Sequence, residues 1–122
     1  RADEDKVKNT IRNELSDIYL FAKDNNIKIL TVYLPIKKEL QKKQAGFPEF
    51  IKIISEVSKE FSHVTFMNLI DKIGYDNDFD ALFFKRDWVH PNSQGHEEFC
   101  NHIFETVKSM MSDNDIFGSC SS

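Results

Sequence analysis

Residues 27–34 read Ile27-Lys28-Ile29-Leu30-Thr31-Val32-Tyr33-Leu34, an almost uniformly apolar run that ends at Pro35. Several of these residues are β-branched and so favour strands, whereas proline cannot donate the backbone hydrogen bond that a central strand needs. A strand with apolar side chains on both faces is typical of a parallel sheet that is covered by helices on both sides. We therefore predict a buried parallel strand over residues 27–34.

Helical patterns lie on both sides of this strand in the sequence. Residues 4–24 carry apolar side chains at steps of three and four, the period of a helix with one buried face. The residues of that predicted face are Val7, Ile11, Leu15, Ile18, Phe21 and Ala22. After the strand, Gly46-Phe47-Pro48 opens a second helix, because proline is favoured in a first turn. The predicted buried face of this helix consists of Phe50, Ile51, Ile54, Val57 and Phe61.

A second apolar strand is predicted at residues 64–69 and a last helix at residues 93–111, where Asn92 or Ser93 can act as the cap. The apolar face of this helix is Phe99, Ile103, Phe104, Val107 and Met110. The lysine-rich residues 36–46 are interpreted as a solvated loop or a short exposed helix. Strands that alternate with helices indicate an α/β fold with parallel strands and flanking helices.

Two strands are too few for a complete fold of this kind, because a doubly wound sheet has about five. They would also leave an open sheet edge. We expect either sequence upstream of Arg1 or a second copy of the chain, paired through the exposed edge as a homo-oligomer, to complete the sheet. The sequence does not begin with Met, so we expect a cut or processed piece of a longer protein. Residues 112–122 are small and polar, and we predict a flexible tail there.

Charge and composition limit the partners that we expect. Sixteen Lys and Arg residues against twenty Asp and Glu residues give a net charge of −4, which predicts no long-range attraction to nucleic acid. The longest apolar runs fall far short of the roughly 20 residues that a membrane-spanning helix needs. We therefore predict no nucleic-acid partner and no membrane span in this segment.

The sharpest local motif is Asp87-Trp88-Val89-His90-Pro91, immediately before the last predicted helix. Pro91 disfavours helical dihedral angles at His90, which places the imidazole on extended backbone at the end of a loop. Asp87, three residues earlier, can turn its carboxylate toward the Nδ1 atom of that ring and leave Nε2 available. An imidazole held in this way is what a serine hydrolase uses as general base and later as general acid.

The motif Asp87-x-x-His90-Pro91-Asn92, followed by Gly95 and an amphipathic helix, resembles the last sequence block of the SGNH (GDSL-type) hydrolases. The strand that ends at Tyr33-Leu34-Pro35 and the strand that leads to Asn68-Leu69-Ile70-Asp71 are similar to the C-terminal half of that family's three-layer, flavodoxin-like α/β/α fold. The resemblance extends from about Val7 to Met111, so residues 1–111 are interpreted as the C-terminal portion of one such domain.

The resemblance implies a Ser-His-Asp site that hydrolyses or transfers acyl groups on ester substrates. We expect no metal or other cofactor. By position, Asp87 and His90 match the family's catalytic acid and base. The family's Gly-Asp-Ser nucleophile, and the glycine and asparagine of its oxyanion hole, have no counterpart in this sequence and would precede Arg1. We therefore expect the parent protein to be an esterase or acyltransferase, and this segment alone to lack substantial activity.

Other interpretations of these residues stay open. Asp87 could cap backbone amides beside a purely structural His90, in a non-catalytic α/β module that binds a partner or completes another domain. His96 and Cys100, four residues apart on one helix face, could bind zinc together with His90, although no established zinc-binding spacing supports this.

Two further groups are weak candidates for a site. Lys85 and Arg86, beside Phe83 and Phe84, could touch an anionic or aromatic ligand or simply mark the return of the chain to the surface. The tail serines Ser119, Ser121 and Ser122 lack the fixed surroundings that activate a hydroxyl as a nucleophile.

Overall fold

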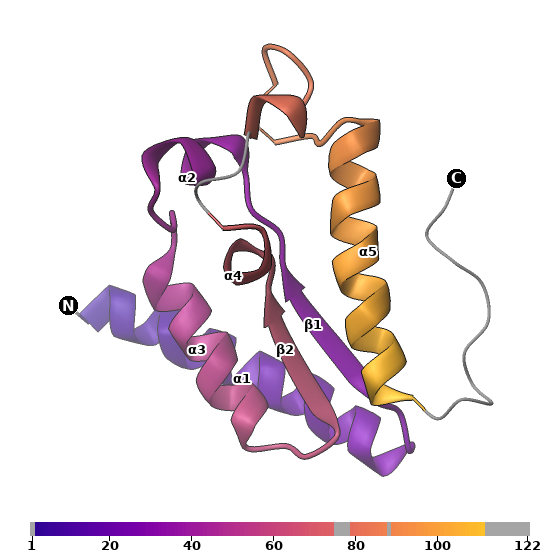
Figure 1. Cartoon of the computed structure of the whole chain (residues 1–122). Coiled ribbons are helices and arrows are strands. Elements are labelled where there is room, and N and C mark those ends of the chain that lie inside the picture. Colours follow the sequence, from indigo (N-terminus) through magenta and orange to yellow (C-terminus); the bar gives the residue numbers. More distant parts are fainter. Residues whose placement is uncertain (1, 75–78, 88, 112–122) are drawn as a thin grey trace. The chain divides into compact units, whose positions relative to one another are not determined.

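The computed structural model describes residues 2–74, 79–87 and 89–111. Contacts divide the chain into two compact units, and each is described by itself. The first, called here the strand unit, consists of Arg1–Tyr33 and Phe47–Asn68, and the second, called the loop unit, consists of Leu34–Gly46 and Leu69–Ser122. The predicted tail at residues 112–122 and Trp88 of the motif lie outside the described residues. Figure 1 labels the helices and strands of the two units.

The strand unit contains a two-stranded parallel sheet. β1 (Ile29–Tyr33) pairs with β2 (Val64–Asn68) along all five residues of each strand. The parallel pairing of strands that alternate with helices confirms the predicted α/β class. β1 starts two residues later than predicted, because Ile27 still donates its backbone amide to the carbonyl of Ala22 at the end of the preceding helix, at 2.8 Å.

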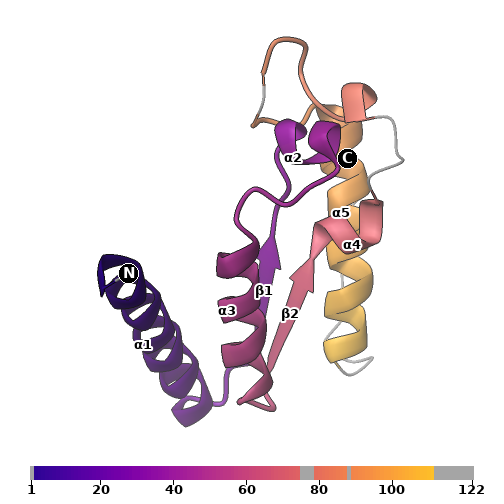
Figure 2. The same ribbon diagram turned by 90° about the vertical axis from the view of Figure 1, so that its left-hand side faces the viewer.

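Two helices belong to the same unit. α1 (Ala2–Asp24) precedes β1, and α3 (Pro48–Lys59) connects the strands and packs along β2 (Figure 2). Pro48 occupies the first turn of α3, as predicted, and the helix begins after Phe47. The core of the unit consists of Tyr19, Ile53, Val57 and Val64, with Ile11, Leu15, Ile29 and Phe61 packed against it.

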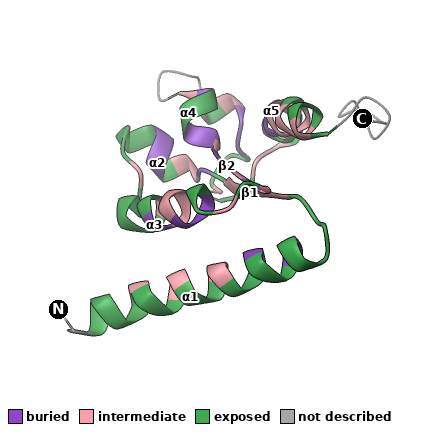
Figure 3. Ribbon diagram, turned by 90° about the horizontal axis from the view of Figure 1, so that it is seen from below, coloured by how far each residue is buried: buried purple, intermediate pink, exposed green. Residues whose placement is uncertain are grey.

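The predicted buried face of α1 is wrong in part. Val7, Ile18 and Phe21 are exposed, whereas Tyr19 is 1% exposed and was not predicted to be buried. Tyr19 and Phe21 are two residues apart and so lie on nearly opposite sides of a helix, which means that burial of one exposes the other. Figure 3 shows the buried and half-buried residues of α1 along the side that is turned towards α3.

Tyr19 is buried because its polar end finds partners. Its hydroxyl lies 2.7 Å from Oγ1 of Thr31 and 3.4 Å from Oγ of Ser58, and its ring meets the edge of Phe61 at a centroid distance of 5.6 Å. A tyrosine can therefore fill the core without leaving an unsatisfied hydroxyl. In α3, Val57 is buried as predicted, but Phe50 is exposed and Ile53, which was not predicted, is 3% exposed.

The loop unit contains α2 (Lys37–Lys42), α4 (Leu69–Ile73), a 3₁₀ helix at Phe79–Ala81 and α5 (Ser93–Met110). α4 packs on α5. It was not predicted, because its five residues directly follow β2 and its apolar residues continue the apolar pattern of that strand. α5 begins and ends within one residue of the predicted bounds. Leu82–Phe84 do not form a third strand. Phe83 makes only an isolated antiparallel bridge with Pro91.

The lysine-rich segment is not simply solvated. α2 buries Glu39 and Leu40, which are 3% and 1% exposed. The Glu39 carboxylate accepts hydrogen bonds from the backbone amides of Ile36, at 3.0 Å, and Gly46, at 2.8 Å, and so closes the segment on itself. Buried charge is tolerated where such bonds replace water. Exposure of the segment was predicted from its lysines alone. The burial of Glu39 was missed because its carboxylate is satisfied by backbone amides, which composition does not reveal.

Among the described residues, no helix combines the length and apolar character needed to cross a bilayer.

Candidate active site

The candidate site is a loop that closes between Phe83 and Pro91. Besides the bridge between these two residues, the amide of Phe84 donates to the carbonyl of His90 at 3.3 Å. The amide of Asp87 donates to the carbonyl of Phe84 at 3.1 Å, which closes a four-residue turn. Arg86 has a φ of 71° at the third position of this turn, a conformation that L residues seldom adopt. These backbone interactions connect the described parts of the loop, residues 83–87 and 89–91.

The carboxylate of Asp87 accepts three hydrogen bonds from its own loop. Its Oδ1 atom accepts from the backbone amides of Val89, at 2.9 Å, and His90, at 3.0 Å, and its Oδ2 atom lies 2.8 Å from Nδ1 of the His90 ring. The two amide bonds and then the bond with the ring lower the pKa of the Asp87 carboxyl from its ordinary value of 3.8 to about 2. Asp87 is therefore an anion at neutral pH.

The contact with Asp87 orients the imidazole of His90. A carboxylate only accepts hydrogen bonds, so Nδ1 must carry the proton of this bond, and in the neutral ring Nε2 then holds a lone pair. The His90 side chain is 74% exposed, and Nε2 has no hydrogen-bond partner within the part of the chain that the structure describes. The spacing Asp87-x-x-His90 predicted this pairing, and the structure brings the two side chains together as expected.

Asn92 fastens the loop to the start of α5. Its side-chain oxygen accepts from the amide of Gly95 at 2.9 Å, which makes it the helix cap. Its side-chain nitrogen donates to the carbonyls of Ala81, at 2.8 Å, and Phe83, at 3.2 Å. The sequence predicted Asn92 or Ser93 as the cap, and it did not predict the two other bonds of Asn92. The side-chain amide of asparagine can donate two hydrogen bonds while its oxygen caps the helix, whereas Ser93 would offer only a hydroxyl. This difference is the signal that could have indicated the two bonds.

Gly95 is required because the chain before the loop runs close to the first turn of α5. A Cβ atom on Gly95 would collide with the carbonyl oxygen of Leu82 and would lie 2.8 Å from Cβ of Pro91. The same Leu82 carbonyl accepts the amide of Asn92 at 2.8 Å. Leu82 and Phe83 are both buried, so the base of the loop is fixed, although His90 at its end is exposed.

The other candidates do not form a site in the described structure. Within residues 2–74, 79–87 and 89–111, no three His, Cys, Asp or Glu side chains are grouped to hold a metal ion. Cys100 is disulfide-bonded, so its sulfur is not available as a thiolate ligand beside His96. Lys85 and Arg86 are exposed, and the tail serines Ser119, Ser121 and Ser122 lie outside the described residues.

The loop contains an oriented imidazole with an ionised partner, and no serine hydroxyl of the described residues makes a hydrogen bond with His90. Comparison of the chain with protein-family models, with curated proteins and with solved structures gave no match.

Proposed function

We propose that this chain is the C-terminal part of an SGNH-like serine ester hydrolase or acyltransferase, in which His90 is the general base and Asp87 orients it. The observation that carries the proposal is the 2.8 Å contact between Oδ2 of Asp87 and Nδ1 of an exposed His90 whose Nε2 atom has no partner among the described residues. The resemblance of Asp87-x-x-His90-Pro91-Asn92 to the family's last block supports the same assignment. The nucleophilic serine is supplied from outside these 122 residues.

In this reaction Nε2 of His90 removes the proton of the serine hydroxyl while the serine oxygen attacks the carbonyl carbon of an ester. The ionised Asp87 stabilises the imidazolium that forms. The imidazolium then protonates the leaving alcohol, and an acyl-serine results. Water or a second alcohol, deprotonated by the same Nε2 atom, then attacks the acyl carbon. The bond to the serine oxygen breaks and the imidazolium returns its proton to that oxygen, which gives hydrolysis or transfer.

We also propose that the parent domain has a flavodoxin-like three-layer fold. The parallel β1 and β2 with α3 between them in the chain are consistent with it, because a right-handed crossover through a helix is the unit from which such sheets are built. A complete sheet needs neighbours for both strands. These neighbours come from the same parent domain, and a second copy of the chain is the alternative source.

The decisive test uses a fluorophosphonate probe, which phosphonylates an activated serine with loss of fluoride, on the full-length protein. We expect labelling of the full-length protein and none of residues 1–122 alone, because this chain supplies the base without the nucleophile. His90→Ala should reduce the rate of labelling by about 1,000-fold or more. His96→Ala is the matched control, because His96 is an exposed histidine six residues away and lies on α5.

Two results would contradict the proposal. One is equal labelling of the wild-type and His90→Ala proteins, which would leave a non-catalytic α/β module as the better description. The other is a natural sequence upstream of Arg1 that contains no Gly-Asp-Ser after an apolar strand.

A further inference from the structure

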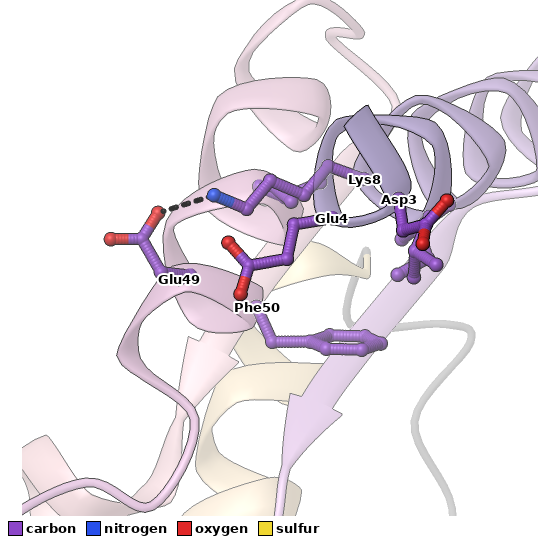
Figure 4. A pocket seen from close by; sticks show the side chains of 8 residues that line it. Asp3, Glu4, Lys8, Glu49 and Phe50 are labelled. Atoms are coloured by element: carbon purple, nitrogen blue, oxygen red, sulfur yellow. Dashed lines mark hydrogen bonds and ion pairs between the residues drawn. The ribbon is translucent and has the colours of Figure 1, made fainter. Parts of the chain in front are cut away.

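Exposed apolar side chains lie in both units of the described structure. In the strand unit, Phe50 lines a pocket of about 320 Å³ between α1 and α3 (Figure 4), and at its edge Lys8 donates to the carboxylate of Glu49 at 3.4 Å. In the loop unit, Phe84 is 55% exposed, and it belongs to the loop that carries His90. Phe84 therefore shares a loop with the proposed general base, whereas the pocket in Figure 4 has no part in the proposed chemistry.

Phe84 stands opposite His90 across this loop. The antiparallel bridge between Phe83 and Pro91 sets the register of the two sides of the loop. One residue further, the amide of Phe84 donates to the carbonyl of His90 at 3.3 Å. Opposed residues of an antiparallel pair have their side chains on the same side. The side chains of Phe84 and His90 are therefore neighbours on one face of the loop.

The preceding residue, Phe83, has its side chain on the other face. Its ring meets that of Phe99 on α5 edge-on at a centroid distance of 6.3 Å, and Phe83 is only 2% exposed. Successive residues of an extended chain alternate between faces, so burial of Phe83 leaves Phe84 on the outer side. The His90 side chain is 74% exposed on this side. The Phe84 ring and the imidazole are therefore both accessible to a bound molecule.

The proposed mechanism determines which part of a substrate comes to this face. As the bond between the acyl carbon and the leaving oxygen breaks, Nε2 of His90 gives its proton to that oxygen. The oxygen must therefore come within hydrogen-bond reach of Nε2, about 3 Å. The alcohol portion of the ester is attached to this oxygen and so lies beside the imidazole, whereas the acyl portion stays bonded to the serine.

We propose that Phe84 is a specificity-determining residue that binds the alcohol portion of the ester, and that the preferred alcohol has an apolar body of several carbon atoms. This inference rests on the proposed function. An apolar body that covers the Phe84 ring removes apolar surface of both partners from water, and an aromatic body can also stack on the ring. A small or charged alcohol gains little from this contact.

The test compares ethyl butyrate with 3-phenylpropyl butyrate as substrates of the full-length protein. The two esters share the acyl group and have primary alcohols of similar acidity, so the ratio of their kcat/KM values measures how well the alcohol portion is bound in the transition state. We expect the wild type to prefer the phenylpropyl ester by about tenfold or more. Phe84→Ala should reduce this preference by about tenfold. Phe84→Gln, which keeps the bulk of the side chain but not its apolar character, should do the same.

Two controls separate binding of the alcohol from support of the loop. Phe21→Ala removes a side chain that is 66% exposed on α1, and it should leave the preference within about twofold of the wild type. The preference for ethyl octanoate over ethyl butyrate reports the acyl portion, and Phe84→Ala should change it by less than about twofold. A role of Phe84 in the loop alone would lower kcat/KM for all three esters in the same proportion.

Two results would overturn this inference. One is a wild-type protein that shows no preference for the phenylpropyl ester. The other is a preference that is the same in the wild type, Phe84→Ala and Phe84→Gln. If the fluorophosphonate probe labels the wild-type protein, either result leaves the proposed function standing. A wild-type protein that the probe does not label would instead remove the proposed function and this inference together.

Discussion

The core around Tyr19 and the loop around His90 are stabilised in different ways. The core is apolar, and Ile53, Val57 and Val64 are each less than a tenth exposed. The loop is exposed at His90. It depends on backbone amides that donate to Asp87 and on backbone carbonyls that accept from Asn92. Apolar burial depends mainly on volume and tolerates substitutions of similar size, whereas this loop depends on individual atoms at fixed positions. An exposed imidazole can be oriented only by hydrogen bonds between atoms at fixed positions.

The largest effect on stability is expected in the core. Ile53→Ala should lower the free energy of unfolding of the strand unit by about 3 kcal/mol, because it removes buried methyl groups and leaves a cavity. Ile18→Ala is the matched control in the same unit, since Ile18 is 56% exposed, and it should cost less than about 0.5 kcal/mol. Denaturant unfolding monitored by NMR measures both. A loss for Ile18→Ala as large as that for Ile53→Ala would show that the buried face of α1 is wrongly assigned.

Gly95→Ala should have the next largest effect, in the loop unit. The added methyl group would collide with the Leu82 carbonyl, so the start of α5 or the base of the loop must shift, at a cost of about 2 kcal/mol. Gly46→Ala is the control, because a Cβ atom there would meet only Glu39 at ordinary contact distances of 3.6–3.7 Å. The measurement is again unfolding by denaturant, together with the backbone shifts of Leu82. A Gly95→Ala protein as stable as the wild type would rule out this close approach.

Asn92→Ala should destabilise the same region somewhat less, by about 1.5 kcal/mol, because a helix cap and two further hydrogen bonds are lost together. Asn101→Ala, an exposed asparagine of the same helix, should change stability by less than about 0.5 kcal/mol. Amide hydrogen exchange should become faster at Asn92 and Gly95 in the Asn92→Ala protein. Unchanged exchange there would mean that neither the cap nor the bonds from Asn92 to Ala81 and Phe83 stabilise this region.

The smallest effect is the dependence of the loop on acid. The folded-state pKa of Asp87 is about 2, below its ordinary value of 3.8, so the ionised form is the one that the loop stabilises. This contribution is complete above about pH 4 and is lost as the pH falls through about 2. We expect the amide resonances of Val89 and His90 to show a transition below pH 4, where the carboxylate that accepts their hydrogen bonds becomes protonated. Asp87→Asn should abolish that transition, and a midpoint near 4 in the wild type would contradict the three hydrogen bonds.

The sequence predicted the helices and strands better than it predicted which face of each helix is buried. The parallel strands and the proline at the start of α3 follow from local residue preferences, and they were predicted correctly. The cap was predicted at Asn92 or Ser93, and the structure has Asn92 in that position. Burial of Tyr19 was missed because it depends on Thr31 and Ser58, which lie far away in the sequence.

In the candidate site, too, local features were predicted and contacts set by the fold were not. Asp87 and His90 could be paired from their spacing because both belong to one short loop. The bonds from Asn92 to Ala81 and Phe83 could not be predicted, because they join carbonyls that are set by the fold and are independent of side-chain type. For the same reason the burial of Glu39 was not foreseen.

The most direct test of the central claim, that His90 is a general base oriented by Asp87, is the kcat of the full-length protein with an activated ester. We predict that His90→Ala lowers kcat by about 10,000-fold or more, while His96→Ala leaves it within about twofold of the wild type. Asp87→Asn, which removes the charge that fixes the tautomer, should lower kcat by about 10,000-fold at most. A His90→Ala protein that turns over the ester as fast as His96→Ala would contradict the account.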